Sequence, residues 1–446
     1  MLKKTKIYEK IRYILWSNKF YRTFFKPFDR LYFPFVDHEI LKIERKTGSV
    51  PLNKIPHVAD LENPEWKMVI DDMKDIFTLD EHSFHRKIWE SVHVVYALMK
   101  SGYLAPENKG LAVGAGREQI LYYLAHKVAH ITGIDLYEGQ YLGGEDERDI
   151  PEVPEKYRPF QYPGEKLKLL RMNALELDFQ DDSFDFIFSL SSIEHFGRLS
   201  DIRRALLEMY RVLKPGGGCL ITTEVKLNRL GGKVPNTRIF RMEDLMSLFK
   251  SCGFQLQEQD MDMRLEERFF NNWVKLPEET FKSPHIHLKF NRVFFTSLAV
   301  LLVKPGNMVK KGDWTGPQSF VPFNYRGEIE VSASPPEGKP GSELPVTVRV
   351  KNTSNFDWFC DGHSYRIAIW VKLLDENGDH LDDHYSEIII PEFIKTGASL
   401  AFDAKVPLPK KEGRYILFFD LKKERLYGFS YFGNPTAELK IGVLKS

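Results

Sequence analysis

The pattern of apolar and polar residues between positions 111 and 303 predicts strands that alternate with helices. The five short apolar runs are LAVG (111–114), ITGID (131–135), LKLLRMN (167–173), FDFIFSL (184–190) and CLITTEV (219–225). Segments with helical spacing separate these runs, which predicts crossover connections and an α/β fold with a parallel sheet. Two later runs, FQLQEQDM (254–261) and RVFFTSLAVLLV (292–303), are expected to be the last strands of the same sheet. Ligands of such sheets bind at the carboxyl edge of the strands.

A helix is expected immediately before the first of these strands. From Ser83 to Met99 apolar residues recur every three or four positions, and Ser101-Gly102 ends the pattern. Residues 31–80 contain prolines and show no long period. We expect this segment to wrap around the domain with short helices.

The first thirty residues combine aromatic residues at helical spacing with positive charge. Tyr13, Trp16, Phe20 and Phe24 form the aromatic stripe, and nine basic residues accompany two acidic ones. One interpretation is a helix that contacts the anionic inner face of a membrane peripherally. The other is an amphipathic helix docked on its own protein. Charges interrupt every apolar run, so neither a signal peptide nor a membrane span is predicted.

The pattern changes in the last third of the chain. Residues 305–324 are rich in glycine and proline, which predicts a linker. Residues 325–446 then alternate apolar and polar positions over at least seven short runs, with turn residues such as Asn377-Gly378 between them. This pattern predicts a β-sandwich. With an N-terminal extension (1–84) and an α/β domain (85–304), the chain is expected to have four parts.

Composition and charge narrow the class of protein. The chain has 446 residues and a formal net charge of +1, which gives no overall attraction to nucleic acid. Its three cysteines, Cys219, Cys252 and Cys360, are odd in number and show no metal-ligand spacing. A reducing, cytoplasmic setting is therefore expected. The oligomeric state does not follow from these features.

The stretch GLAVGAGREQ (110–119) raises the question of a cofactor. Gly114 and Gly116 follow an apolar strand, as in a tight turn that opens a helix. A dinucleotide-binding loop needs a third glycine where Gln119 stands, so NAD is disfavoured. The G-x-G-x-G form found in enzymes that use S-adenosylmethionine (SAM) has glycine where Glu118 stands. The ten residues alone do not decide between the two cofactors.

Motifs further along the chain resolve the choice. An Asn-Ala pair (173–174) follows the third strand, and the fourth strand reads DFIFS (185–189). The pair Glu194-His195 comes next, and the turn LKPGG (213–217) precedes the fifth strand. In this order and spacing, the motifs resemble those of the class I SAM-dependent methyltransferases, over residues 85–304. The resemblance implies a Rossmann-like sheet of seven strands, SAM as the cofactor and methyl transfer as the activity.

The resemblance also implies which residues hold the cofactor. Gly114, Ala115 and Gly116 would lie against the amino-acid end of SAM, because a loop without large side chains lets backbone amides approach closely. Asp135, at the end of the second strand, would accept hydrogen bonds from both ribose hydroxyls.

The adenine and ammonium groups of SAM would meet residues that depart in part from the family pattern. Asn173, in place of the usual aspartate, and Ala174 would contact adenine, and the Asn173 carbonyl can still accept a hydrogen bond from the adenine amino group. Ser191 would lie near the cofactor at the end of the fourth strand. Ala112 stands where the family often has an acid, so Glu118 is the candidate partner of the ammonium.

Histidines are the candidates for acid-base chemistry. His195, beside Glu194, stands where a base for an alcohol acceptor is expected, because the pKa of imidazole suits that task. In the alternative interpretation, the Glu-His pair caps the next helix or holds the loop. His285 and His287 alternate with apolar residues, and without further ligands they are expected on a solvated strand face, not in a metal site.

Two further regions bear on the acceptor. The insert 137–164 replaces a regular crossover helix, and it is expected to be either a lid on the substrate side or a surface loop. Residues 325–444 resemble the immunoglobulin-like sandwiches of bacterial enzymes and transporters of surface-polysaccharide synthesis. Aromatic faces stack on sugar rings or pack in the core. The aromatic candidates are Trp358, Tyr365, Trp370, Tyr427, Tyr431 and Phe432, of which the last three are expected to be the better exposed.

These features support two main hypotheses. The first is a SAM-dependent methyltransferase that methylates a hydroxyl of a glycan or glycolipid in cell-surface polysaccharide synthesis. The second is a non-catalytic binding protein with a degenerate SAM fold, supported by the departures at Ala112 and Glu118. A methyltransferase that acts on a small metabolite or a protein stays open as a third hypothesis.

Overall fold

The structure is a computed structural model in which the chain forms two compact units. The described residues are 40–41, 50–74, 76, 84–138, 148–228, 234–235, 237–266, 273–279, 282–306, 324–360, 366–423 and 428–444. Unit 1 comprises Met1–Leu136 and Gly164–Gln318, and unit 2 comprises Tyr137–Pro163 and Ser319–Ser446. The insert therefore groups with the C-terminal residues, although it lies inside the segment expected to form the α/β domain. The N-terminal stripe and most of the expected linker lie outside the described residues.

Unit 1 is built on a sheet of nine strands. In spatial order the strands are β4 (Leu167–Arg171), β3 (His130–Asp135), β2 (Lys109–Val113), β5 (Phe184–Leu190), β6 (Leu213–Lys226), β11 (Val293–Val303), β10 (Leu288–Phe290) and β9 (Val274–Lys275), while β7 (Gln255–Leu256) also pairs with β11. The first five strands are parallel, as predicted, and β11 runs antiparallel to β6. The sheet exceeds the expected seven strands because β9 and β10, too short to show a period, extend its edge.

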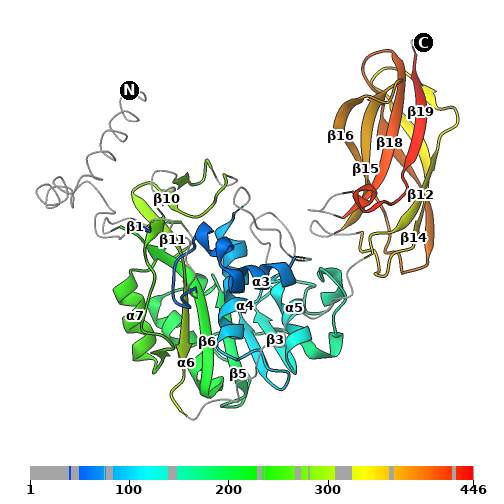
Figure 1. The fold of residues 1–446 in the computed structure, drawn as a ribbon. Coiled ribbons are helices and arrows are strands. Elements are labelled where there is room, and N and C mark those ends of the chain that lie inside the picture. The colour runs from blue at the N-terminus through cyan, green and yellow to red at the C-terminus, as the bar shows by residue number, and fades with distance from the viewer. Residues whose placement is uncertain are drawn as a thin grey trace, which may run out of the picture. The chain divides into compact units, whose positions relative to one another are not determined.

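Helices cover both faces of this sheet. Helix α4 (Arg86–Lys100) lies across β5, β6 and β11, and α5 (Ile120–Lys127) lies beside β3 and β4 (Figure 1). On the other face, α6 (Leu199–Val212) and α7 (Met242–Ser251) bury their apolar sides in one core with the central strands. All seven residues of β5 are buried, as a strand covered on both faces requires. The loops after β2, β3, β5 and β6 consequently meet at one edge.

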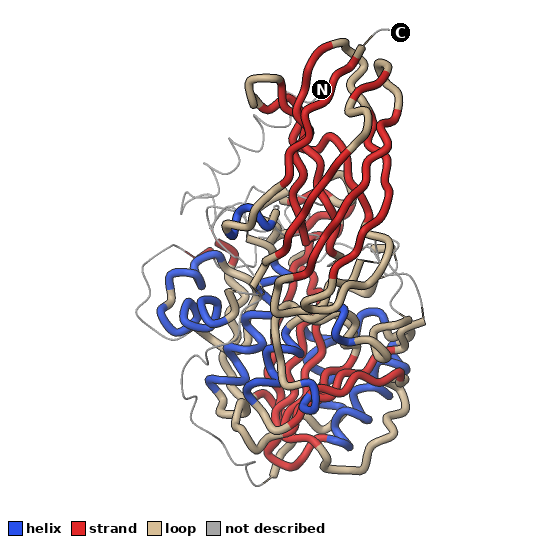
Figure 2. Tube along the Cα trace, turned by 90° about the vertical axis from the view of Figure 1, so that its right-hand side faces the viewer, coloured by secondary structure: helices blue, strands red, loops and turns tan. Residues whose placement is uncertain are grey.

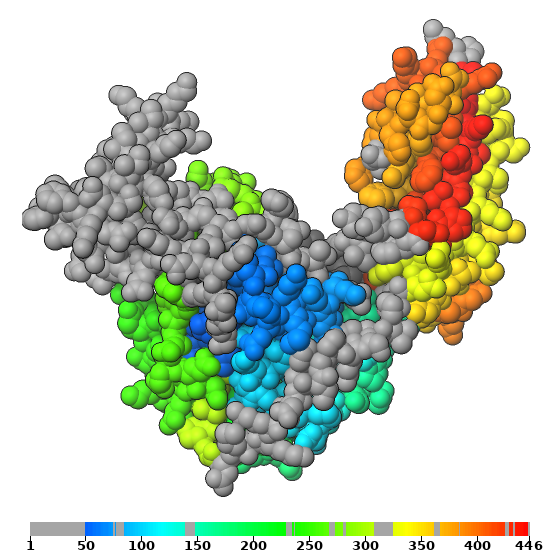
Figure 3. All heavy atoms as spheres, in the orientation of Figure 1, coloured from blue at the N-terminus to red at the C-terminus, as the bar shows by residue number. Residues whose placement is uncertain are grey.

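The segment before α4 wraps onto the same sheet. It contains the short helices η1 (Val58–Glu62) and α3 (Pro64–Asp72), as expected. The backbone of Lys54 exchanges two hydrogen bonds with Ala299 in β11. The buried Lys54 ammonium pairs with Asp60, which also accepts a hydrogen bond of 2.8 Å from Trp89 in α4. Part of this segment, blue in Figure 3, lies on the surface of unit 1 in the view shown.

Unit 2 consists of two sheets that share an apolar core. One sheet contains β12 (Gly327–Ser332), β14 (Glu343–Asn352) and β17 (Ser399–Pro407). The other contains β13 (Glu337–Gly338), β19 (Ala437–Val443), β18 (Gly413–Lys423), β15 (Ile367–Asp375) and β16 (His380–Ile389). The long strands run along the length of this unit (Figure 2). Alternate residues of β14 are buried, which matches the period of two in its sequence.

Contacts within unit 2 explain why the insert groups with it. Gln161 donates a hydrogen bond to the backbone carbonyl of Asn355. The buried Lys423 ammonium in β18 lies 3.5 Å from the carbonyl of Arg158, and burial lowers the pKa of Lys423 to about 7, with a further effect from the Arg158 charge. The insert is thus tied to the β-rich unit by polar contacts that its sequence does not reveal.

The structure bears on some of the aromatic candidates for sugar stacking. Trp358 is fully buried in the core of unit 2. One face of Trp370 is covered by Lys422, whose nitrogen lies 4.5 Å from the ring centroid. Tyr365 and Tyr427, and the side chains of Tyr431 and Phe432, lie outside what the structure describes. Whether this unit has the immunoglobulin-like fold stays a prediction.

Candidate functional site

The loop after β2 has a shape that requires glycine. Gly114 has φ +72° and Gly116 has φ +43°, both in the left-handed region. A Cβ atom on Gly114 would lie 2.4 Å from the Cβ atom of Ser192. The amides of Gly114 and Ala115 both donate to the carbonyl of Ile134 in β3, at 3.0 and 2.8 Å. The loop is therefore fixed against the neighbouring strand and packs closely on Ser192.

Asp135 connects the end of β3 to this loop. One of its carboxylate oxygens accepts the Gly116 amide at 2.9 Å, and the other accepts the Leu136 amide at 2.7 Å. A carboxylate oxygen can accept a second hydrogen bond. Both oxygens therefore retain the capacity to bind two neighbouring hydroxyls, such as those of a ribose.

The turn after β4 lies beside the end of β3. The Met172 amide donates to the Asp135 carbonyl at 2.9 Å. Asn173 is exposed, and its side-chain carbonyl accepts the Leu175 amide at 3.0 Å, so this side chain shapes the turn. Ala174 is half-buried against the core of unit 1. The fold thus brings the predicted adenine contacts to the same edge as the predicted ribose contact.

Ser191 connects the end of β5 to helix α4. It has φ +44°, an uncommon conformation for a residue other than glycine, and its amide donates to Thr222 in β6 at 3.0 Å. Its hydroxyl donates to Glu90 at 2.6 Å. Strained residues held by their surroundings are frequent at binding sites. Glu90 is therefore fixed at the edge where the cofactor loops meet.

Glu90 belongs to a buried charged cluster that the sequence does not reveal. One Nη of Arg86 lies 2.7 Å from Glu224 in β6 and 3.2 Å from Glu90, and Lys87 lies 3.3 Å from Glu90. Burial disfavours the charge of Glu90, but Lys87 and Arg86 outweigh burial, so its pKa lies below the usual value. The cluster is completed by hydroxyls of Ser191, Thr222 and Ser297, each of which donates to Glu90.

Glu118 stands next to this cluster, one residue after Arg117 in the glycine loop. Burial raises the pKa of Glu118 to about 8, and the negative charge of Glu90 adds to this effect. A cation bound at this position would reverse the shift, because an opposite charge favours the carboxylate. Ala112, where a relative of the predicted family often has an acid, is buried in β2.

The turn after β5 contains the Glu194-His195 pair, and the two side chains differ in environment. Glu194 is buried, and one carboxyl oxygen accepts the Thr223 hydroxyl at 2.7 Å. Its other oxygen has no hydrogen-bond partner among the described residues. Burial raises the pKa of Glu194 to about 8, with Lys87 opposing and Glu224 adding to the shift. His195, the predicted base, is exposed at the end of the turn η4 (Ile193–His195).

The expectation that His285 and His287 lie on a solvated strand face is wrong. Both side chains are buried. The backbone of His285 exchanges hydrogen bonds with Phe84 and Arg86 at the start of α4, and its ring stacks on that of His85 with centroids 4.2 Å apart. Burial lowers the pKa of His285 to about 3, so this imidazole is neutral. Among the described residues, no group of three or more metal-ligating side chains is arranged to hold a metal ion.

Helix α4 is therefore a part of the site that the sequence analysis predicted only as a helix. The spacing of Arg86 and Glu90, four residues apart, indicates a helical ion pair, but not its burial against β6. Glu224 gives no sequence signal beyond a charged residue near the end of an apolar strand.

No helix in the described part of the chain is both long and apolar enough to cross a membrane.

Comparison with known proteins agrees with this geometry. Residues 111–221 match the family model described as "Methyltransferase domain". The ubiquinone/menaquinone biosynthesis C-methyltransferase UbiE of Brucella canis is 31% identical over 169 residues, which cover 35% of this chain and 53% of that protein. A demethylmenaquinone methyltransferase of Lysinibacillus sphaericus is 31% identical over 137 residues, with coverages of 29% and 50%. The chain thus spans about half the length of the curated relatives it matches.

Solved structures are also similar to this chain. A SAM-dependent methyltransferase from Methanosarcina mazei shares 18% sequence identity and a TM-score of 0.30, and the match covers 46% of this chain and 96% of that one. Residues 111–221, which match the family model, contain the glycine loop, Asp135, the Asn173 turn and the Glu194 turn. This segment is a SAM-dependent methyltransferase domain, and SAM is its cofactor.

Proposed function

We propose that this protein transfers the methyl group of SAM to a hydroxyl oxygen of its acceptor. The observation that carries the proposal is the buried Glu194 carboxyl, which Thr223 holds through one oxygen while the other oxygen has no partner among the described residues. An alcohol is a weak nucleophile until its proton is removed. A positioned carboxyl with a pKa of about 8 is suited to that removal near neutral pH.

The residues at the carboxyl edge fit SAM. Gly116 has open space where a Cβ atom would lie, with only an Asp135 oxygen at 3.9 Å. Asp135 has acceptor capacity for two hydroxyls, and Glu118 becomes a stable carboxylate when a cation is near. We propose that the glycine loop lies against the amino-acid end of SAM, that Asp135 binds the ribose and that Glu118 pairs with the ammonium. Asn173 and Ala174 would lie against adenine, and Ser191 would lie beside the cofactor. SAM supplies a methyl group on a sulfonium, which is already activated for transfer.

The chain's own residues then have to align the acceptor and take its proton. Glu194 accepts the hydroxyl proton on its unpartnered oxygen, while Thr223 fixes the orientation of the carboxyl group. The Lys87 ammonium favours the carboxylate form that accepts the proton. His195, exposed on the same turn, is the second candidate for this role. The pH profiles of variants at the two positions distinguish His195 from Glu194.

The acceptor class rests on the C-terminal unit. The resemblance of residues 325–444 to sandwiches of surface-polysaccharide proteins supports a glycan or glycolipid as the acceptor. The basic, aromatic N-terminal residues support a cytoplasmic protein that contacts the inner face of a membrane. In the proposal, unit 2 binds the growing chain while unit 1 methylates it.

Carbon methylation is a second candidate function, favoured by a separate observation. The relatives from Brucella canis and Lysinibacillus sphaericus are named a ubiquinone/menaquinone C-methyltransferase and a demethylmenaquinone methyltransferase. A hydroquinone acceptor also loses a hydroxyl proton before its ring carbon takes the methyl group from the sulfonium, and the proton on that carbon then leaves to restore the ring. Glu194 would therefore serve the first proton removal in either reaction.

Isotope transfer tests the proposal and separates the two acceptor atoms. Purified protein is incubated with methyl-labelled SAM and, in parallel, a glycolipid, a soluble glycan and a hydroquinone. We expect label in the glycolipid or glycan, and mass spectrometry should place it on oxygen. Label on a ring carbon of the hydroquinone would favour the second candidate. Absence of transfer to every acceptor, with SAM bound, would contradict the proposed function.

A further inference from the structure

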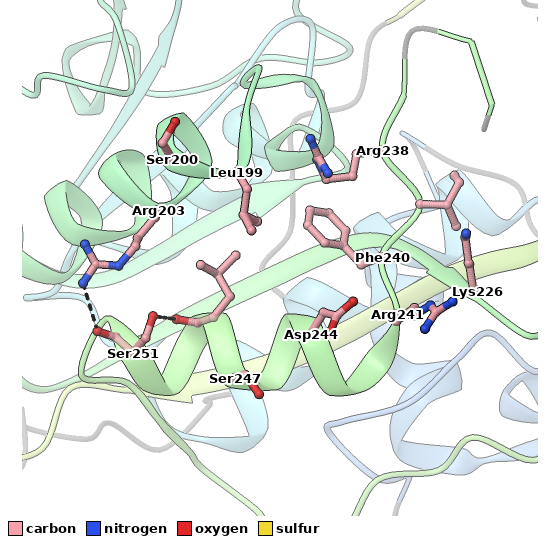
Figure 4. Close-up of a pocket in the computed structure, with 12 residues that line it drawn as sticks. Leu199, Ser200, Arg203, Lys226, Arg238, Phe240, Arg241, Asp244, Ser247 and Ser251 are labelled. Carbon is pink, nitrogen blue, oxygen red and sulfur yellow. Dashed lines mark hydrogen bonds between the residues drawn. The ribbon is translucent and has the colours of Figure 1, made fainter. Parts of the chain in front are cut away.

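A pocket of about 650 Å³ lies between helices α6 and α7, outside the residues that hold SAM in the proposal. Its volume is in the range of sites for small molecules. Its apolar part is formed by Leu199, Ile239, Phe240 and Leu248. Figure 4 labels Leu199 and Phe240. Three serines, Ser200, Ser247 and Ser251, add hydroxyl groups to the lining.

The charge of this pocket is strongly one-sided. Four cationic side chains, Arg203, Lys226, Arg238 and Arg241, line it together with a single acid, Asp244. Figure 4 draws Arg203 at one end, where it donates to the Ser251 carbonyl at 3.5 Å, and Lys226 and Arg241 at the other. Cations gathered in a concave, partly apolar site attract anions more strongly than the same charges spread over a surface. A chain with a net charge of only +1 has concentrated positive charge here.

The backbone of the pocket is joined to the turn that carries Glu194. The Arg238 amide donates to the Glu194 carbonyl at 3.3 Å, and the Phe240 amide donates to the Glu224 carbonyl at 2.9 Å. Lys226 is the last residue of β6, two positions beyond Glu224. Leu199 follows Glu194 by five residues and begins α6. A ligand in the pocket would therefore lie against the segment that holds the proposed base.

We propose that the pocket between α6 and α7 binds a phosphate or diphosphate group carried by the methyl acceptor. Arginine and lysine pair with phosphate oxygens through charge-assisted hydrogen bonds, and serine hydroxyls donate to the same oxygens. The four cationic side chains outnumber the one acidic side chain of the pocket, and their excess positive charge is more than a ligand with a single carboxylate would balance. The charge of a diphosphate matches this excess. That the phosphate belongs to a methyl acceptor rests on the proposed function. Anion binding by the pocket does not depend on methyl transfer.

Calorimetry with inorganic diphosphate tests the pocket in the full-length protein. The variant R238Q/R241Q removes two pocket cations, and R349Q/R414Q removes two exposed arginines of unit 2 as a matched control. We expect the wild type and the control to bind diphosphate, and the pocket variant to bind it at least about 10-fold more weakly, since exposed charge-assisted hydrogen bonds are lost. R238K/R241K, which keeps the charges, should retain most of the affinity. Equal binding by all proteins, or no binding by the wild type, would overturn the proposal.

A SAM titration on the same proteins separates this inference from the proposed function. Unchanged SAM affinity in R238Q/R241Q shows that the variant is folded and that the defect lies in the anion pocket. If SAM fails to bind while diphosphate binding depends on Arg238 and Arg241, methyl transfer fails and the anion pocket stands.

Vesicles distinguish the two sources of such a phosphate. Phosphatidylcholine vesicles are prepared with and without phosphatidic acid, and co-sedimentation of the wild type, R238Q/R241Q and R349Q/R414Q is compared. A lipid-borne phosphate predicts that R238Q/R241Q sediments less than the matched control only when phosphatidic acid is present. A soluble, nucleotide-like or sugar-linked phosphate predicts equal sedimentation of these two variants, with the difference in diphosphate affinity retained.

Discussion

Replacing Glu194 by glutamine tests the chemistry of the site most sharply. Glutamine has nearly the shape of glutamate, and its carbonyl can still accept the Thr223 hydroxyl that holds Glu194 at 2.7 Å. The change removes only the ability to take a proton. Since general base catalysis contributes at least about 100-fold, we expect kcat/KM to fall by about that factor or more while SAM affinity stays the same.

The pKa of about 8 for Glu194 gives this prediction a pH dependence. Only the ionised carboxylate accepts a proton, and its fraction rises from about one tenth at pH 7 to about nine tenths at pH 9. The wild-type kcat/KM should therefore rise by about tenfold over this interval and then level off. The rise should be absent in E194Q.

The assay is the release of S-adenosylhomocysteine, measured from pH 6 to pH 9.5 with the acceptor identified by label transfer. His195→Ala is the comparison, because His195 lies exposed on the same turn. If Glu194 is the base, His195→Ala keeps the pH profile of the wild type. A profile that survives in E194Q and disappears in His195→Ala would refute the role given to Glu194 and assign it to the histidine.

Three further changes test separate parts of the site. In the free protein Glu118 is largely protonated below its pKa of about 8, so SAM affinity should increase as the pH rises toward 8, and calorimetry of E118Q should show no such increase. Gly114→Ala should lower the free energy of unfolding by about 1–3 kcal/mol and weaken SAM binding, because alanine disfavours the left-handed backbone and its Cβ atom would collide with Ser192. Gly378→Ala is the control in urea unfolding, because Gly378 has φ +92° but open space around it, so that only the backbone effect remains. Equal losses of stability in the two variants would contradict the collision with Ser192. Arg86→Met should lower the free energy of unfolding by about 3–5 kcal/mol, because Glu90 and Glu224 lose a buried partner, and a loss below about 1 kcal/mol would show that the cluster relaxes around the gap.

The order of elements in unit 1 could be predicted because its strands are covered on both faces. A buried parallel strand needs a nearly continuous apolar run, and β5 shows one over all seven of its residues. Strands β9 and β10, of two and three residues, are too short for any period to be visible. Their pairing depends on β11, which provides the edge.

The meeting of the expected cofactor residues at one edge of the sheet could be predicted because their positions depend on local features. Gly114 and Asp135 act through backbone shape and strand ends, which a short stretch of sequence encodes. The buried charges could not be predicted, since Glu90 and Glu224 are 134 residues apart and share Arg86 as a partner only when α4 packs on β6. The same limit explains His285, whose burial depends on the start of α4 and not on its own alternating neighbours.

The grouping of the insert with unit 2 could not be predicted from the sequence, for a related reason. Residues 137–163 show loop composition, and their partners far along the chain are the backbone carbonyl of Asn355 and the buried Lys423. Backbone partners leave no residue pattern. Hydrogen exchange on unit 2, with and without residues 137–163 replaced by a short glycine-serine linker, would show how far this unit depends on the insert.

The central claim is that the glycine loop and Asp135 form a working SAM site, and a calorimetric titration of SAM into the wild type and Asp135→Ala tests it most directly. Asp135→Ala removes the acceptor of two ribose hydroxyls, each hydrogen bond to a charged group being worth about 1.5–3 kcal/mol. We therefore expect the wild type to bind SAM and the variant to bind it at least about 100-fold more weakly. Equal affinity in the two proteins, or no binding of SAM by the wild type, would contradict the claim.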